Sequence, residues 1–381
     1  MSTLFNTDQY DFRTEPMFFG KDLGIARSDI SKHEIFNKLA EKQLGFFWRP
    51  EEVDIATDKH QFEALDEHEK HIFTSNLKYQ ILLDSVQGRS PTSVFSQVTS
   101  LPEMEDWIAK WAFSETIHSN SYTHIIQGIY NSPSEQFDDI LRTPEIIERA
   151  IAVTADYDKI DQMIMLYRLK LNTQQITASD GTVYEPFTLR ELKHQFMRTM
   201  YQIQIVEAIR FYVSFACSFA FAERSLMEGN AKIIKLILRD EVLHFQATRE
   251  MIQLWKDGTD DLEMTSIYNE MEASGELVDM YKATVEQEKD WADYLFKDGS
   301  MIGLNADILK QYLEYMTNIR MNQVGLPMQY PTKENPLPWM NSWADSDGVQ
   351  VAPQETEQSS YLTAAVDNSI DRDALGGFDL D

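Results

Sequence analysis

Cysteine is almost absent from this 381-residue sequence, which contains only Cys217. A single thiol excludes an intramolecular disulfide and cannot supply a dithiol reductant. Cys217 lies in an apolar segment, where a small buried side chain is expected. If the protein takes part in reducing chemistry, the reducing thiols therefore belong to another protein.

Basic residues are also scarce, since 34 Lys and Arg stand against 62 Asp and Glu and give a formal net charge of −28. Nucleic-acid binding depends on clustered Lys and Arg that neutralise phosphates. An anionic membrane surface would repel a chain of this charge. The sequence therefore predicts neither nucleic acid nor membrane as a partner.

Long apolar runs and an N-terminal targeting pattern are missing as well. The first twelve residues contain neither the basic start nor the apolar stretch of a signal peptide. The longest near-continuous apolar run, Phe211–Ala222, is shorter than the roughly 20 residues that span a bilayer. These features predict a cytoplasmic protein whose most apolar segment is a buried helix.

Helical periodicity dominates residues 32–317. It predicts helices over Lys32–Trp48, Asp66–Gly88, Leu101–Tyr130, Pro144–Leu171, Leu189–Glu228, Ala231–Trp255 and Gly275–Phe296. Thr188 is a plausible N-cap, and Pro102 suits a first helical turn. The segment Gln174–Thr188 places Asp180-Gly181 between strand-forming residues, which indicates a hairpin. We expect an all-α bundle with a small β-hairpin insertion.

The composition changes near Trp343. Residues 344–381 are acidic, contain Arg372 as their one basic residue and hold few large apolar side chains, so they cannot offset the entropy of ordering. We therefore expect a folded domain over residues 1–343 and a flexible tail over 344–381. Leu375, Phe378 and Leu380 are candidate anchors for a partner protein, the alternative being an inert terminus.

Two Glu-x-x-His pairs stand in apolar segments, Glu115 with His118 and Glu241 with His244. Residues three apart lie on one helical face, so both side chains of a pair can reach one ion. A third pair, Glu191 with His194, stands among basic residues, and we interpret it as chance.

A lone carboxylate precedes each pair at a similar distance: Asp84 lies 31 residues before Glu115, and Glu207 lies 34 residues before Glu241. Such gaps suit a helix, a turn and an antiparallel return. Four helices would then present the ligand set of ferritin-like di-iron or di-manganese bundles.

Charge and donor type agree with two ions. Two divalent cations would balance the carboxylates with neutral imidazoles, and oxygen donors with imidazole suit iron or manganese. The alternative is a set of core ion pairs, Glu207 with Arg210 and Asp84 with Arg89. The order and spacing of the whole set favour the metal site.

Tyr122 follows His118 by four residues, so it should lie one turn beyond the metal ligands on the same face. Most tyrosines at such a spacing are core residues, which is the alternative here. Phe211, Phe215 and Ile237 stand at helical spacing from the other ligands and could exclude water.

Several segments resemble the core motifs of the class I ribonucleotide reductase small subunit, most closely the bacterial class Ia type. They are Asn76–Arg89, Trp111–Ile126, Glu207–Arg224 and Glu228–His244, and the likeness extends to Glu15–Gly20, Phe46–Asp54, Gln287–Asn305 and Val349–Leu362. A bacteriophage-encoded copy would look similar.

The resemblance implies roles for individual residues. The implied ligands of one metal ion are Asp84, Glu115 and His118, and those of the other are Glu207, Glu241 and His244, with carboxylates able to bridge. The implied cofactors are two iron ions per chain, or a manganese-containing pair, with O2 as the oxidant. Tyr122 matches the residue that is oxidised to a neutral tyrosyl radical.

The resemblance also implies a radical-transfer route. Trp48 and Asp240, together with His118, match its part inside the small subunit, while Tyr361 and Glu355 match its part in the tail. The implied partners are a second copy of the chain and a large subunit that binds the ribonucleotide and is reached through the tail. Familiar relatives end close to the last apolar residue, whereas here Asp381 follows Leu380.

Two other functions share parts of this pattern. A stand-alone di-iron oxidase or desaturase has the same ligand set but gives no reason for an acidic tail with Tyr361. A ferritin-type iron-binding protein is far shorter and needs no tyrosine beside the ligands.

Overall fold

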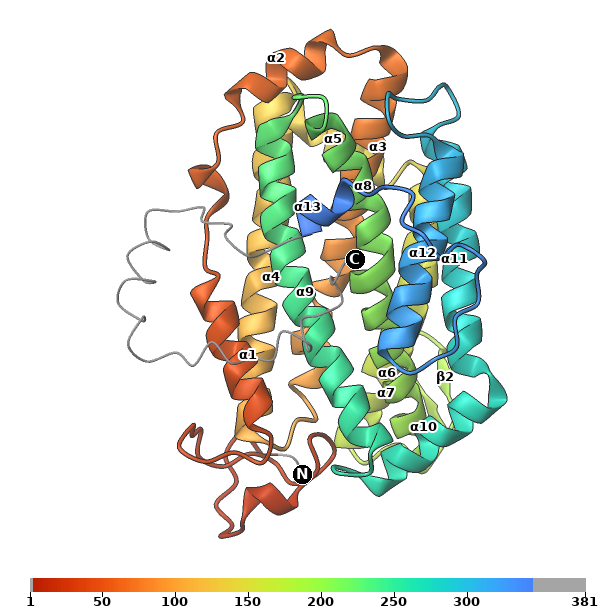
Figure 1. Ribbon diagram of the computed structural model, residues 1–381. Helices are drawn as coiled ribbons and strands as arrows, with labels where there is room; N and C mark the ends of the chain where they lie inside the picture. The colour runs from red at the N-terminus through yellow and green to blue at the C-terminus, as the bar shows by residue number, and fades with distance from the viewer. Residues whose placement is uncertain (1–2, 345–381) are drawn as a thin grey trace.

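The computed structural model describes residues 3–344, which form a bundle of long helices that run side by side (Figure 1). The bundle consists of α3 (Glu67–Gln87), α4 (Pro102–Ile129), α6 (Pro144–Arg168), α7 (Leu189–Ile205), α8 (Phe211–Ala222), α9 (Glu228–Lys256), α11 (Glu276–Leu295) and α12 (Ala306–Gln323). Shorter elements are η1 (Phe12–Thr14), α1 (Glu34–Gly45), η2 (Pro50–Glu52), α2 (Ala56–Ala64), α5 (Pro133–Ile140), α10 (Leu262–Ser274) and α13 (Met340–Ala344). The predicted all-α architecture is confirmed.

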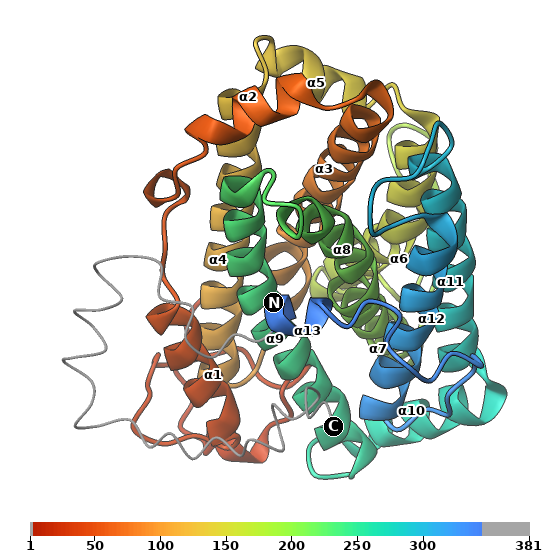
Figure 2. The ribbon, with the colours of Figure 1, turned by 45° about the horizontal axis from the view of Figure 1, so that its top comes forward.

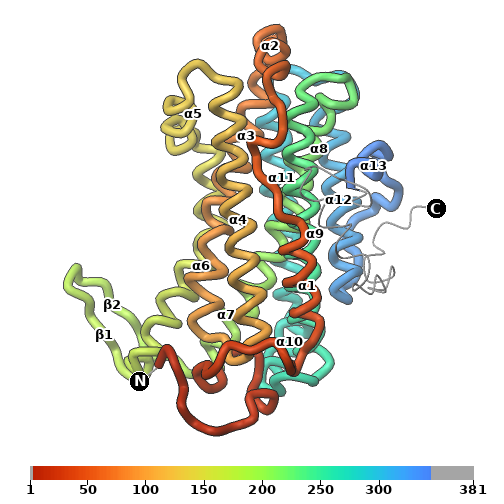
Figure 3. Tube along the Cα trace, turned by 90° about the vertical axis from the view of Figure 1, so that its left-hand side faces the viewer, coloured from red at the N-terminus to blue at the C-terminus, as the bar shows by residue number. Residues whose placement is uncertain are grey.

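The predicted hairpin is confirmed too. Strands β1 (Ile176–Thr177) and β2 (Val183–Tyr184) pair antiparallel, with Ile176 opposite Tyr184. Gly181 adopts a φ of 89° in the turn, a conformation that costs glycine little. The hairpin projects away from the helices at one end of the molecule (Figure 3).

Four helical segments surround one interior. Helix α3 packs against α4 and α8, and α9 packs against the same two helices on the other side. Helix α1 covers α4, while α11 and α12 pack against each other on the opposite flank (Figure 2). Segment η4 (Val206–Arg210), which carries Glu207 and leads into α8, packs against α9 as well, so the segments that carry the predicted metal ligands are neighbours.

Helix boundaries follow local chemistry. The Thr188 side chain accepts a hydrogen bond from the Glu191 amide, and Glu191 Oε2 accepts one from the Thr188 amide at 2.7 Å. This capping box satisfies two amide donors that the first turn leaves free, so the predicted N-cap is confirmed. Pro102 and Pro144 begin α4 and α6, where a missing N–H costs nothing.

The prediction of one continuous helix over Leu189–Glu228 is wrong. The π-helical segment η4 (Val206–Arg210) separates α7 from α8, and α8 ends at Ala222. Ser225 and Met227 have φ values of 57° and 56°, which stop the helix before α9 begins. Helix α9 therefore starts at Glu228, three residues before the predicted Ala231. A second π-helical segment, η3, covers Pro91–Phe95.

Within residues 3–344, one helical stretch, Leu189–Ala222, is long and apolar enough to span a membrane, but its apolar window is wholly buried inside the protein. Burial of this kind is what an interior helix requires, as predicted for Phe211–Ala222. Cys217 lies in it as a buried free thiol. The predicted domain boundary and the tail over 344–381 lie at and beyond the end of the described residues, so both stay predictions.

Candidate metal centre

Six acidic and imidazole side chains meet between the four ligand-bearing segments, and each is at most 2% exposed. They are Asp84 from α3, Glu115 and His118 from α4, Glu207 from η4, and Glu241 and His244 from α9. The structure thus brings together all the residues that the sequence singled out as metal ligands.

The side chains form two overlapping groups whose potential ligand atoms lie within 4.8 Å of one another. The first group is Asp84, Glu115, His118 and Glu241, and the second is Glu115, Glu207, Glu241 and His244. Because Glu115 and Glu241 belong to both groups, their carboxylates lie where they could bridge two adjacent ions.

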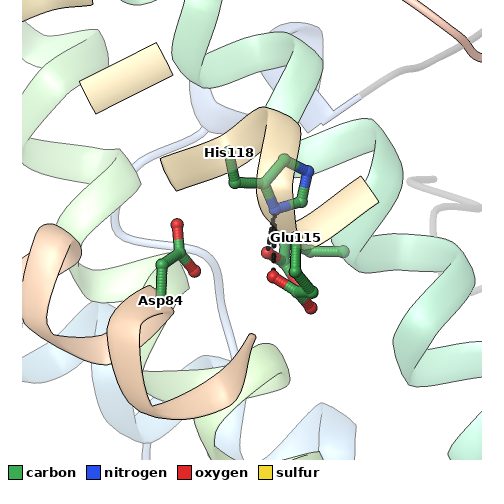
Figure 4. A group of neighbouring side chains, drawn as sticks. Asp84, Glu115 and His118 are labelled. Atoms are coloured by element: carbon green, nitrogen blue, oxygen red, sulfur yellow. Dashed lines mark ion pairs between the residues drawn. The ribbon is translucent and has the colours of Figure 1, made fainter. Parts of the chain in front are cut away.

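Both imidazoles turn Nδ1 toward the carboxylates. His118 Nδ1 lies 3.3 Å from Glu115 Oε2 and 3.2 Å from Glu241 Oε1. His244 Nδ1 lies 3.2 Å from an oxygen of each of the same two glutamates. Figure 4 shows His118 and Glu115 in contact on one helix, with Asp84 facing them from another.

The donor atoms fit a pair of cations. Both oxygens of Asp84 and one oxygen of Glu207 have no hydrogen-bond partner among the described residues, although all are buried. His118 Nδ1 and the nearest oxygens of Glu115 and Glu241 lie close to one another but make no hydrogen bond among the described residues. Buried polar atoms normally find a partner, and a buried charge is tolerated only when it is balanced. Two divalent ions would satisfy these atoms and neutralise the carboxylates.

The proton affinities show how strongly the side chains interact. Burial and the neighbouring Glu115 charge raise the pKa of Asp84. Burial also acts to raise the pKa of Glu115, but the two histidines outweigh it and lower that pKa to about 2. Burial acts to lower the pKa of His244, yet Glu115 and Glu241 raise it to about 10. The site therefore favours positive charge at its centre.

Outer hydrogen bonds hold several of these side chains. Trp111 Nε1 donates to Glu115 Oε1 at 2.9 Å, and Gln87 Nε2 donates to Glu207 Oε1 at 2.6 Å. Ser114 Oγ lies 2.8 Å from His244 Nε2. The sequence-based interpretation missed these three supporting residues. Trp111 and Gln87 stand one helical turn from Glu115 and Asp84, which is the signal that could have suggested them.

Tyr122 lies on α4 beyond His118 and is 1% exposed. Its hydroxyl has no hydrogen-bond partner among the described residues. Burial first, and then the negative charge of Asp84, raise the pKa of Tyr122 well above its usual value. Phe211, Phe215 and Ile237 are fully buried, as a water-excluding wall requires.

A hydrogen-bonded chain joins the centre to Trp48. His118 Nε2 lies 3.1 Å from Asp240 Oδ2, and the same oxygen accepts a hydrogen bond from Trp48 Nε1 at 2.9 Å. Tyr361 and Glu355, the two tail residues of the implied route, lie outside the described residues.

The alternative pairings do not form: neither oxygen of Asp84 has a hydrogen-bond partner, Arg89 included, among the described residues. Arg210 donates to Glu288 at 2.6 Å instead of pairing with Glu207. His194 of the third Glu-x-x-His pair lies 3.2 Å from Glu276, and its Glu191 caps α7. That third pair is apart from the centre, as predicted.

Comparison with known proteins agrees with this geometry. The family model "Ribonucleotide reductase, small chain" matches residues 29–336. The chain is 54% identical over 378 residues to the ribonucleoside-diphosphate reductase 1 subunit beta of Escherichia coli O157:H7, with 99% of each chain covered. It is 44% identical over 392 residues to the subunit beta of Enterobacteria phage T4, again covering 99% of each.

Solved structures show the same fold. The ribonucleotide reductase R2 subunit from Clostridium botulinum superposes with a TM-score of 0.76 at 25% identity and covers 90% of this chain and 98% of its own. The dimanganese(II)-NrdF protein of Streptococcus sanguinis has a TM-score of 0.62 at 18% identity, covering 84% of this chain and 99% of its own.

Proposed function

Because the chain belongs to the class I ribonucleotide reductase small-subunit family, an oxidoreductase component that acts with a large subunit, we propose that its buried centre generates a radical on Tyr122. The proposal rests on the buried metal-ligand atoms that make no hydrogen bond among the described residues. They surround Glu115 and Glu241, the two residues that belong to both ligand groups. A stand-alone oxidase and a ferritin-type protein are not favoured, because relatives that match 99% of the chain carry the reductase name.

Two iron ions per chain are the proposed cofactors, and a manganese-containing pair is the second candidate because the same donors suit it. When bound, the ions would supply the activation of O2 and the oxidising equivalents that no side chain here provides. Asp84, Glu115 and His118 would hold one ion, and Glu207, Glu241 and His244 the other.

The side chains around the ions define what happens to Tyr122. The phenol is protonated at neutral pH, and its raised pKa disfavours a separate phenolate, so the electron and the proton must leave together. The apolar burial of the ring excludes water, which would otherwise quench a radical. A neutral tyrosyl radical suits such a pocket because it carries no charge to be solvated.

We assign the transfer of an electron and a proton out of the site to the three hydrogen-bonded side chains of His118, Asp240 and Trp48. Their contacts at 3.1 Å and 2.9 Å allow a proton to shift along Asp240 as Trp48 gains or loses an electron. Tyr361, assisted by Glu355, is proposed to continue the route to the large subunit from the tail.

The proposed partners are a second copy of the chain and the large subunit, the latter bound through residues 344–381. Leu44 and Phe113 remain 55% and 48% exposed, and Phe113 stacks on Phe47 with ring centroids 6.1 Å apart. Neighbouring exposed apolar side chains are typical of protein contacts, so we assign the dimer contact to this side of α1 and α4. The cytoplasmic location stays a proposal, supported by the burial of the apolar window within residues 189–222.

One experiment tests the proposal directly. Metal-free protein is loaded with Fe(II) without oxygen, exposed to air and measured by electron paramagnetic resonance beside an iron determination. The expected result is two ions per chain and an organic radical signal. The matched Glu241→Ala variant should lose at least one ion and the signal, because Glu241 belongs to both ligand groups. Normal metal content and radical yield in that variant would overturn the assignment.

A further inference from the structure

Two successive hydrogen bonds connect Glu207 through Gln87 on α3 to Tyr157 on α6. Gln87, at the end of α3, donates from Nε2 to Glu207 Oε1 at 2.6 Å. Tyr157, on α6, donates its hydroxyl to Gln87 Oε1 at 2.5 Å. Glu207 and Gln87 are fully buried and Tyr157 is 7% exposed, so water does not compete for these bonds.

The Tyr157 hydroxyl determines which end of the Gln87 amide faces the centre. An amide has a donor end and an acceptor end, and only the donor end can bind a carboxylate oxygen. Tyr157 donates to the acceptor end, so the NH2 group remains turned toward Glu207. Ser90 Oγ also donates to the Gln87 carbonyl at 2.9 Å and holds the backbone of that residue.

The consequence is a carboxylate with one oxygen occupied and one oxygen free. Glu207 Oε1 accepts from Gln87, whereas Oε2 has no hydrogen-bond partner among the described residues. Asp84, the lone carboxylate of the other half of the centre, has neither oxygen partnered. The two halves, which repeat in sequence, thus differ in how firmly their lone carboxylate is held.

We propose that Tyr157 is a positioning residue for the ion bound by Glu207 and His244, acting through Gln87. The Gln87 bond fixes the Glu207 carboxylate in one orientation, with Oε1 4.0 Å from His244 Nδ1, so that the carboxylate already faces the ion site before an ion binds. This inference rests on the proposed two-ion centre and concerns one of its two sites. Removing an outer partner of a ligand typically weakens metal binding about 10-fold to 100-fold.

The test is a titration of the full-length, metal-free chain with Mn(II) under exclusion of oxygen, with free Mn(II) measured by its magnetic resonance signal. Tyr157→Phe should weaken one of the two binding steps about 10-fold or more and change the other less than about threefold. The selective effect separates positioning from a general loss of structure, which would weaken both steps.

Tyr281→Phe is the matched control. Tyr281 is a fully buried tyrosine that donates to Gln204 Oε1 at 3.3 Å, and Gln204 Nε2 makes no onward hydrogen bond among the described residues. The control removes the same hydroxyl from the same kind of bond, without a link to a ligand. Both Mn(II) affinities should match those of the unchanged protein.

A double-variant cycle tests whether Tyr157 acts through Gln87. Gln87→Met removes the amide, and Tyr157→Phe added to it should weaken binding no further. Equal weakening by Tyr157→Phe with and without the amide would overturn the proposal, as would unchanged affinities in Tyr157→Phe. If the unchanged protein bound fewer than two Mn(II) ions, the proposed two-ion centre itself would be wrong. This result differs from those that contradict only the role of Tyr157, so the two failures can be told apart.

Discussion

At the scale of single residues, the centre is defined by polar atoms that the protein buries without giving them a partner. Tyr122 is one of them, since its hydroxyl is buried and unpartnered among the described residues. A buried hydroxyl without a hydrogen bond destabilises a protein by roughly 1–3 kcal/mol, so retaining one calls for a functional reason.

The first prediction concerns this hydroxyl. Tyr122→Phe removes one oxygen from an apolar pocket, so the melting temperature should stay the same or rise and both ions should still bind. The organic radical signal should disappear, because a phenyl ring has no proton to lose with its electron. Iron content and magnetic resonance, measured on the same sample, check this. Tyr212→Phe, another fully buried tyrosine, is the control and should keep the radical; an equal signal in Tyr122→Phe would move the radical to another residue.

Sequence spacing predicted the six ligand candidates because helical geometry relates residues three and four apart. Spacing could not predict the contact between Trp48 and Asp240, because these residues are 192 positions apart in the chain. That contact was expected through the family resemblance alone. The bond from Tyr157 to Gln87 was not foreseen at all, since it depends on how α6 packs against the end of α3.

At the scale of the elements, periodicity predicted the principal helices and failed where a helix changes its winding. The π segment η4 lies within an apolar run that reads as one uninterrupted helix, and it carries Glu207. A π turn accommodates an extra residue, which rotates the side chains after it relative to those before. The predicted helices also do not include α2, α5, α10, α12 and α13, of which α2, α5 and α13 have fewer than ten residues.

The connection between α9 and α10 supports a second prediction. Asp260 lies there with its side chain fully buried and accepts hydrogen bonds from the Met17 amide and from Lys32 Nζ at 2.7 Å. His33 Nε2 lies 3.2 Å away. Burial acts to raise the pKa of Asp260, but His33 and Lys32 outweigh it and lower that pKa below its usual value of 3.8.

A group whose pKa is lower in the folded state stabilises the protein above its unfolded pKa and loses that effect as the pH falls through the folded value. Asp260→Asn should therefore lower the free energy of unfolding by about 2 kcal/mol at pH 7 and by progressively less below about pH 4. Chemical denaturation across this range checks the difference. Asp257→Asn, in the same connection, should change little; a difference that did not depend on pH would contradict the linkage.

At the scale of the whole molecule, the four ligand-bearing segments lie inside a larger bundle, so the centre is shielded on several sides by other helices. One face of helix α4 holds Glu115, His118 and Tyr122, while Phe113 on another face is exposed. A dimer contact on that outer face would bring the two centres of the dimer near the shared axis.

The third prediction tests this contact. Phe113→Glu places a charge in the proposed apolar interface, and two such charges would meet across a two-fold axis. The variant should sediment as a single chain, whereas the unchanged protein should sediment as two, with equal metal content per chain. Leu141→Glu changes an even more exposed apolar residue at the end of α5, 72% exposed against 48% for Phe113, and should remain dimeric. A dimeric Phe113→Glu variant would place the interface elsewhere.

The last prediction separates a subunit from a self-sufficient enzyme, and it concerns the predicted tail, of which residues 345–381 lie outside the described residues. Their apolar side chains Leu375, Phe378 and Leu380 stand at the end of an acidic segment, with Tyr361 between them and the folded body. Docking such a segment requires its apolar contacts to exceed the entropy lost on ordering, so the terminal side chains should carry most of the affinity.

Removing the last twenty residues should therefore abolish binding to the large subunit while the metal content and the Tyr122 radical stay unchanged. Tyr361→Phe should instead bind the large subunit normally and keep the radical, yet stop ribonucleotide reduction, because a phenyl side chain cannot relay an electron together with a proton. Tyr184→Phe, on the β-hairpin, is the control and should retain turnover. Full turnover by Tyr361→Phe would show that Tyr361 does not take part in radical transfer. Unchanged activity of the truncated chain would show that the protein works without a docked partner.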